Sequence, residues 1–196
     1  MGLICGIDEA GRGPLAGPVT AAAVILPPDF PFSILADSKK LSEKQRNAIL
    51  PIILEKASAY GLGWVWHFEI DRINIHRASL LAMERAFLDL PVRPFRALAD
   101  GKFYPRLPVP GEAVVGGDGL IPEIMAASIL AKTARDRWMV RHSWLEPGYD
   151  FEKHKGYPTF GHRNLCITLG PSSIQRMSFS ITVPTKSKTE DLFGTF

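Results

Sequence analysis

The stretch ICGIDEAGRGP, residues 4–14, decides how this chain folds. It begins as a short apolar run, typical of a buried strand, and ends in two adjacent carboxylates, Asp8 and Glu9. Successive side chains of a strand point to opposite faces. One of the two acids must therefore face the core side, which is unfavourable unless that acid is paired or bound to a metal.

Length and composition indicate an ordinary globular protein. The chain has 196 residues, of which 46% are hydrophobic and 22% are charged, enough for one well-packed domain. No apolar run has the length of a membrane span, and the N-terminus lacks a signal-peptide pattern. We expect a soluble, cytoplasmic protein in which Cys5 and Cys166 are apolar fillers.

Strand-like and helix-like patterns alternate along the chain. We expect strand-like runs at residues 3–8, 18–26, 62–68, 94–100 and 112–118, and helices at residues 42–60, 74–90, 122–142 and 159–171. Pro51 should kink or split the first helix. This order predicts an α/β fold, a mixed sheet flanked by helices. The polar composition after residue 177 predicts a flexible tail, residues 178–196, behind a domain of residues 1–177.

Three of the strand-like runs end in an acid: Asp8, Asp100 and Asp118. Ligands of open α/β sheets gather at strand ends, and carboxylates gathered there cannot all stay ionised without compensation. Oxygen-only ligands favour Mg²⁺ or Mn²⁺ as the compensating ion. Two such ions about 4 Å apart would suit in-line hydrolysis of a phosphodiester.

These acids also have a plainer interpretation, as turn formers or helix caps. That alternative is strongest for Asp118, which follows two glycines. It is weaker for Asp8 and Glu9, because adjacent acids on a strand point to opposite sides.

The loop GRGPLAG, residues 11–17, matches a dinucleotide-binding fingerprint with alanine in the last place. That fingerprint must open a helix, whereas strand-like sequence follows here, so the dinucleotide interpretation fails. The glycines still indicate a loop whose backbone a ligand can approach closely. With Arg12 in its middle, such a loop suits binding of a sugar-phosphate chain.

Basic residues concentrate in residues 37–46, 132–142 and 152–157, although the net charge is only +3. Such clusters suit a phosphate backbone. For any single cluster, a solvated helix face is the simpler interpretation.

The motifs, taken together and in order, resemble the type 2 ribonuclease H family, ribonuclease HII. The matching stretches are GIDEAGRGPLAGPVTAAAVIL, DSKKLSEKQR, IDRINIHRASLLAM, ADGK, VVGGD, AASILAKTARDR and HKGYPT. The first is highly specific, whereas ADGK or VVGGD alone would carry no weight.

The resemblance implies an RNase H-like fold with a small helical C-terminal portion. It also implies a monomeric endonuclease that depends on Mg²⁺ or Mn²⁺ and cuts RNA within duplexes. The preferred site would be a single ribonucleotide embedded in DNA, cut on its 5′ side to leave 3′-hydroxyl and 5′-phosphate ends.

Matched motif by motif, the resemblance also implies site residues. The residues implied for catalysis and metal binding are Asp8, Glu9, Asp100 and Asp118. Those implied for contact with the 2′-hydroxyl are Gly11, Arg12 and Gly13. Tyr157 would stack on the next sugar, and Lys39 would contact a phosphate.

The chain departs from the family pattern in places. Gly116 replaces a usual lysine before the last acid, and Gln175 and Met177 stand in a segment that is usually more basic. His154 and His162 are interpreted as surface histidines. The tail sequence EDLF faintly resembles sliding-clamp peptides, against the simpler interpretation of a solvated tail.

Two other functions stay open at this point. A general nuclease for RNA–DNA hybrids would keep the acids but ignore the junction at a single ribonucleotide. A binding module without activity would keep the basic surface and the loop; the presence of all four carboxylates argues against it.

Overall fold

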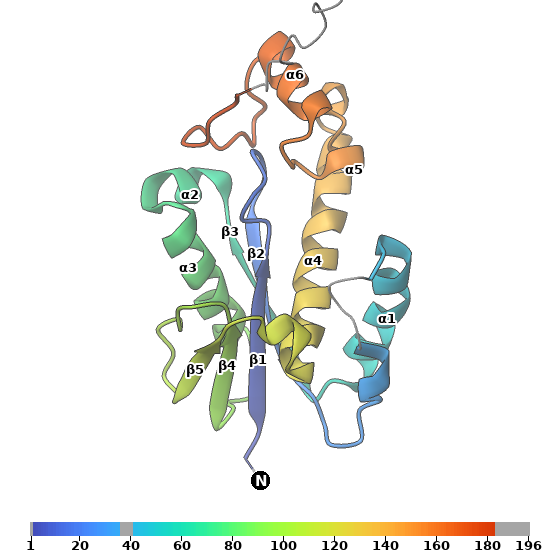
Figure 1. The fold of residues 1–196 in the computed structure, drawn as a ribbon, viewed down its shortest axis with the longest axis vertical. Coiled ribbons are helices and arrows are strands. Elements are labelled where there is room, and N and C mark those ends of the chain that lie inside the picture. The colour runs from blue at the N-terminus through green and yellow to red at the C-terminus, as the bar shows by residue number, and fades with distance from the viewer. Residues whose placement is uncertain (1, 36–40, 183–196) are drawn as a thin grey trace, which may run out of the picture.

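The computed structural model describes residues 2–35 and 41–182. A five-stranded sheet in the order β3-β2-β1-β4-β5 lies between two layers of helices (Figure 1). The strands are β1 (Ile4–Ala10), β2 (Val19–Ile25), β3 (Ala59–Val65), β4 (Arg96–Asp100) and β5 (Gly111–Val114). β1 and β2 form an antiparallel hairpin, β3 is antiparallel to β2, and β4 and β5 continue parallel to β1. The predicted mixed α/β sheet is confirmed.

The α-helices follow the expected pattern, with two additions. They are α1 (Glu43–Lys56), α2 (His67–Ile73), α3 (Ile75–Leu88), α4 (Pro122–Ser143), α5 (Phe151–His154) and α6 (Phe160–Leu169). The short helices α2 and α5 were not expected from the sequence. Of the two alternatives expected at Pro51, a kink or a split, the split is wrong, since α1 runs through Pro51 as one helix. Pro51 is exposed, so water can bind the carbonyl that loses its helical partner.

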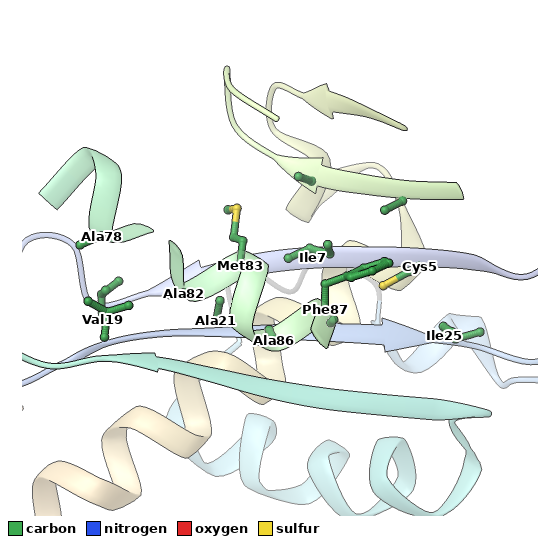
Figure 2. Packing of buried hydrophobic residues seen from close by; sticks show 14 of the residues in the cluster. Cys5, Ile7, Val19, Ala21, Ile25, Ala78, Ala82, Met83, Ala86 and Phe87 are labelled. Atoms are coloured by element: carbon green, nitrogen blue, oxygen red, sulfur yellow. The ribbon is translucent and has the colours of Figure 1, made fainter. Parts of the chain in front are cut away.

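The face of the sheet that carries Ile7 packs against α3. Small residues of that helix, Ala82 and Ala86, lie among the larger Met83 and Phe87, and all four are buried (Figure 2). A Cβ added to Gly63 of β3 would lie 2.0 Å from the carbonyl oxygen of Ala82. Close approach of this helix therefore requires glycine on the strand.

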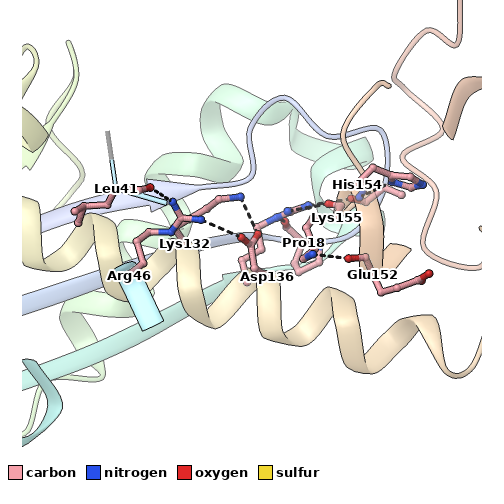
Figure 3. Close-up of polar contacts among 11 residues, drawn as sticks. Pro18, Leu41, Arg46, Lys132, Asp136, Glu152, His154 and Lys155 are labelled. Atoms are coloured by element: carbon pink, nitrogen blue, oxygen red, sulfur yellow. Dashed lines mark hydrogen bonds and ion pairs between the residues drawn. The ribbon is translucent and has the colours of Figure 1, made fainter. Parts of the chain in front are cut away.

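The opposite face packs against α4, and α1 packs on α4 from outside (Figure 1). At Gly6 of β1 a Cβ would lie 2.2 Å from the Glu123 carbonyl carbon, so α4 begins directly against the central strand. Asp136 of α4 accepts a hydrogen bond from Lys132 at 2.8 Å and lies 3.9 Å from Arg46 of α1 (Figure 3).

The C-terminal segment lies at one end of the sheet, next to the connection between β1 and β2 (Figure 1). Ala16 of that connection forms an isolated antiparallel bridge with Gln175. Beyond the expected domain boundary at residue 177, Ser178 donates its backbone N–H and hydroxyl to Asp71 at 2.9 and 2.6 Å. The packed chain thus extends past residue 177. Among the described residues, no helix is long and apolar enough to cross a membrane.

Candidate metal centre and the adjoining loop

Parallel pairing of neighbouring strands brings three aspartates together. Ile7 pairs with Ala99 between β1 and β4, so the next residues, Asp8 and Asp100, lie side by side. Asp118 lies in the 3-10 turn after β5, and its N–H donates to an Asp100 carboxylate oxygen at 3.3 Å. One carboxylate oxygen from each aspartate lies within 4.8 Å of the other two. A single ion can therefore contact all three.

The Asp8 carboxylate is buried, with 5% of the residue exposed. It accepts hydrogen bonds from the Glu9 N–H at 2.7 Å and from the Ser128 side chain of α4. Burial raises the pKa of Asp8 well above its ordinary value, and the charges of Glu9 and Asp100 raise it further. A divalent cation would relieve this repulsion, and the all-oxygen donor set fits Mg²⁺ or Mn²⁺.

Glu9 points to the other side of β1, as adjacent strand residues must. It is not one of the three clustered acids. Its carboxylate accepts a hydrogen bond from Arg12 at 3.1 Å. Burial raises the pKa of Glu9, although the Arg12 guanidinium opposes that effect. Glu9 also lines a small cavity together with Asp100 and Lys102.

The loop after β1 presents two exposed residues, Arg12 and Gly13, beside the carboxylates. Gly11 has a φ of +95°, and a Cβ there would lie 2.1 Å from the Nε of Arg135. At Gly13 a Cβ would meet nothing within 4 Å. The fold therefore requires glycine at residue 11, whereas it leaves room for a side chain at residue 13.

Tyr157 is held against this loop by backbone contacts. The Leu15 N–H donates to the Gly156 carbonyl at 2.8 Å. The partly exposed Tyr157 ring lies 4.9 Å from the Lys132 ammonium and 5.6 Å from the Arg135 guanidinium. The two motifs, 145 residues apart from Arg12 to Tyr157, thus belong to one surface.

Two buried arginines, Arg135 and Arg176, were missed as functional candidates from the sequence. Both are 0% exposed and donate to backbone carbonyls of residues 11–18. The sequence placed Arg135 in a basic cluster suited to phosphate, and for this residue that interpretation is wrong. Both lie in polar stretches, ILAKTARDRW and SIQRMSF, so no local pattern distinguishes them from solvated arginines.

Some expectations change at the C-terminal segment. His162 is fully buried rather than on the surface. Its ring stacks on His154 at 4.2 Å, and its Nδ1 lies 2.9 Å from the Tyr157 carbonyl oxygen. Burial lowers the pKa of His162 to about 4, so the neutral ring supports the Tyr157 loop. Gln175 donates to the Leu15 carbonyl at 3.0 Å, a structural contact.

The remaining residues named from the sequence are Lys39, Gly116, Met177 and the EDLF segment. Lys39 and the EDLF segment lie outside the described residues. Gly116 adopts a left-handed backbone with a φ of +72°, a conformation in which the lysine usual in the family would be strained. Met177 is exposed.

Comparisons with known proteins agree on one family. The sequence model of ribonuclease HII matches residues 5–182. Ribonuclease HII of Dechloromonas aromatica is 54% identical over 179 residues, which is 91% of this chain and 91% of that protein. Ribonuclease HII of Treponema denticola is 51% identical over 195 residues, 91% and 98% of the two chains.

Solved structures share the fold at lower identity. The ribonuclease H2 from Pyrococcus horikoshii superposes with a TM-score of 0.76 at 20% identity, covering 91% of this chain and 94% of that one. Ribonuclease HII in a PCNA complex from Archaeoglobus fulgidus gives 0.77 at 22%, covering 94% and 98%. A Bst ribonuclease HIII solved with Mn²⁺ gives 0.73 at 16%, covering 91% and 67%.

Replacing Asp8 with asparagine tests whether the aspartate cluster is built for a cation. The folded-state pKa of Asp8 is raised, so in metal-free protein the ionised form destabilises the fold above that pKa, and stability rises as pH falls toward the ordinary value. At neutral pH in EDTA we expect Asp8→Asn to raise Tm by about 2–4 °C, the shift that 1 kcal/mol produces in a chain of this size.

Adding a divalent cation should give wild type a higher Tm than Asp8→Asn, the reverse of the order in EDTA. At 100 times its Kd, a cation adds about 2.7 kcal/mol to wild type and much less to the variant. Thermal unfolding in EDTA, Mg²⁺ and Mn²⁺ measures both effects. Asp29→Asn, the same change at an exposed carboxylate, is the control. Equal cation stabilisation of wild type and Asp8→Asn would contradict the site.

Proposed function

This chain belongs to the ribonuclease HII family, and from that premise we propose that it cuts DNA duplexes 5′ of single embedded ribonucleotides. Family membership makes it a type 2 ribonuclease H, an endoribonuclease that acts on RNA–DNA substrates. The finer proposal adds the products, 3′-hydroxyl and 5′-phosphate ends, and a role in starting ribonucleotide removal during DNA repair and replication.

One observation carries the proposal: the aspartate cluster and the exposed loop are parts of one strand end. Asp8 lies within β1, and the loop begins at Gly11, directly after that strand. The hydrogen bond from Arg12 back to Glu9 shows how close the loop lies to the carboxylates. A backbone bound at Gly13 would therefore reach the acids within one or two nucleotides.

The carboxylates have distinct tasks in this proposal. Asp8, Asp100 and Asp118 would hold the cation, with Mg²⁺ or Mn²⁺ favoured and two ions present during catalysis. Glu9 would join them when Arg12 releases it toward a substrate phosphate. A bound cation supplies a water of lowered pKa and offsets negative charge on the phosphate. Asp8, on the central strand, is our candidate for the bridging ligand.

The loop and Tyr157 would select the cleavage site. Only the 2′-hydroxyl distinguishes RNA from DNA at one nucleotide, so selection needs close hydrogen bonding there. The backbone of Gly11, Arg12 and Gly13 would make those bonds, and substrate without the hydroxyl would leave them unmade. The exposed part of the Tyr157 ring would stack on the next sugar, whose deoxyribose offers an apolar face.

Partners complete the proposal. Lys39 would contact a substrate phosphate. Residues 186–196 would make a weak contact with a sliding clamp, an idea supported by the archaeal homologue solved with PCNA, and their deletion should abolish clamp pull-down. Family membership favours a cytoplasmic location, where we propose that the enzyme acts as a monomer.

Cleavage of three labelled duplexes tests the function. The strands are all DNA, DNA with one ribonucleotide, and all RNA opposite DNA, each with Mg²⁺, Mn²⁺ or EDTA. We expect a metal-dependent cut 5′ of the lone ribonucleotide, and a rate lower by orders of magnitude in Asp8→Asn with duplex binding retained.

The other outcomes separate the remaining functions. Cleavage of the all-RNA strand alone would indicate a general hybrid nuclease and remove the junction-sensing roles of Arg12 and Tyr157. Binding of duplexes without any cleavage would indicate a binding module. Turnover by Asp8→Asn at the wild-type rate would contradict the carboxylate site.

A pair of glycine variants tests the loop. Gly13→Ala meets no protein atom within 4 Å, so Tm should be unchanged. Cleavage at the single ribonucleotide should fall about tenfold or more, because the methyl group occupies space that the substrate needs. Gly11→Ala should instead lower Tm, because its φ of +95° and the Arg135 side chain exclude a Cβ. Full activity in Gly13→Ala would exclude close approach at this residue.

A further inference from the structure

A buried arginine lies beneath the exposed loop and bonds to its backbone. Arg176 donates from Nε to Gly17 at 2.8 Å, from Nη1 to Arg12 and Pro14 at 3.1 and 2.9 Å, and from Nη2 to Gly11 at 2.7 Å, in each case to the carbonyl oxygen. One side chain from the C-terminal segment thus fixes four peptide groups of the loop.

A second buried arginine extends the same arrangement. Arg135 of α4 donates from Nε to the Pro18 carbonyl at 2.8 Å and from Nη2 to the Ala16 carbonyl at 3.1 Å. Its Nη1 donates to the Lys155 carbonyl at 3.0 Å, two residues before Tyr157. The contacts at Pro18 and Lys155 lie along α4 in Figure 3. Arg135 therefore fixes the end of the loop relative to the Tyr157 segment.

These bonds determine which way the loop's N–H groups face. In a planar trans peptide, the C=O of one residue and the N–H of the next point in opposite directions. Because the carbonyls of Gly11 and Arg12 point inward to Arg176, the N–H groups of Arg12 and Gly13 point away from it. Arg12 and Gly13 are also the exposed residues of the loop. Successive outward N–H groups make a concave site for an oxygen ligand.

The charges of Arg135 and Arg176 indicate that the two side chains do more than fill space in the core. Within the described part of the chain, Arg135 and Arg176 donate their hydrogen bonds to backbone carbonyls. Burial, and then the charge of Arg135, lower the pKa of Arg176 to about 9. Apolar side chains often replace buried charges without loss of stability. The presence of two guanidiniums that repel each other is explained if the loop backbone must be held in one geometry.

We propose that Arg176, assisted by Arg135, is a positioning residue that sets the enzyme's discrimination between ribonucleotide and deoxyribonucleotide by turning the N–H groups of Arg12 and Gly13 toward the substrate. The inference rests on the proposed function, since it assigns the origin of the selectivity proposed there. Neither arginine touches the substrate; both act through the loop backbone.

Arg176→Lys separates geometry from charge. Lysine keeps the positive charge but lacks the planar fork that reaches carbonyls on several sides. The readout is the ratio of Kd for an all-DNA duplex to Kd for the same duplex with one ribonucleotide, measured in EDTA to prevent cleavage. We expect wild type to favour the ribonucleotide about tenfold. In Arg176→Lys the ratio should fall at least about fivefold, with the all-DNA Kd unchanged.

Arg85→Lys is the matched control, because Arg85 also donates to a backbone carbonyl, that of Trp64, and pairs with Glu69. It should keep the wild-type ratio. Arg135→Lys repeats the test where Arg176→Lys does not fold by circular dichroism. An unchanged ratio, or equal weakening toward both duplexes, would overturn the positioning role. A wild-type ratio of one would instead overturn the proposed function itself.

Discussion

The parallel pairing of β1 with β4 is the constraint on which the rest of the structure depends. It places Asp8 beside Asp100 and takes the Asp8 carboxylate out of water, where burial and its neighbours raise its pKa. Around this pair the fold is closely packed: α4 lies directly on Gly6 of β1, and Asp118 donates its N–H to Asp100. A bound cation would offset the charge that this packing concentrates.

The second level of organisation joins distant parts of the chain to that strand end. The loop after β1 packs Ala16 against Met139, Phe151 and Ile174. Hydrogen bonds from Arg135 and Arg176 fix its backbone carbonyls. Arg135 also donates to the Lys155 carbonyl and so connects the loop to the Tyr157 segment, whose Tyr157 carbonyl lies 2.9 Å from Nδ1 of the buried His162. The candidate metal site and the loop proposed for substrate selection are therefore held by different elements that meet at one strand end.

The sequence predicted the sheet and the acids because both depend on local pattern. Apolar runs ending in Asp8 and Asp100 already contain the strand and the candidate metal-binding carboxylate, and Asn74 and Pro122 mark helix starts. The parts that failed depend on tertiary contacts. Arg135 appeared basic and solvated because six of the seven carbonyls that it and Arg176 bind lie more than 110 positions away along the chain. His162 appeared exposed because its ring is covered only when α6 packs against the rings of Phe151 and His154.

A crystal structure with Mn²⁺, with anomalous scattering used to locate the ion, would show whether the three aspartates bind a cation together. We expect a peak bonded to carboxylate oxygens of Asp8, Asp100 and Asp118, at roughly 2 Å as expected for a hard cation. A peak elsewhere, or none at saturating Mn²⁺, would contradict the assignment of these three aspartates as the metal centre.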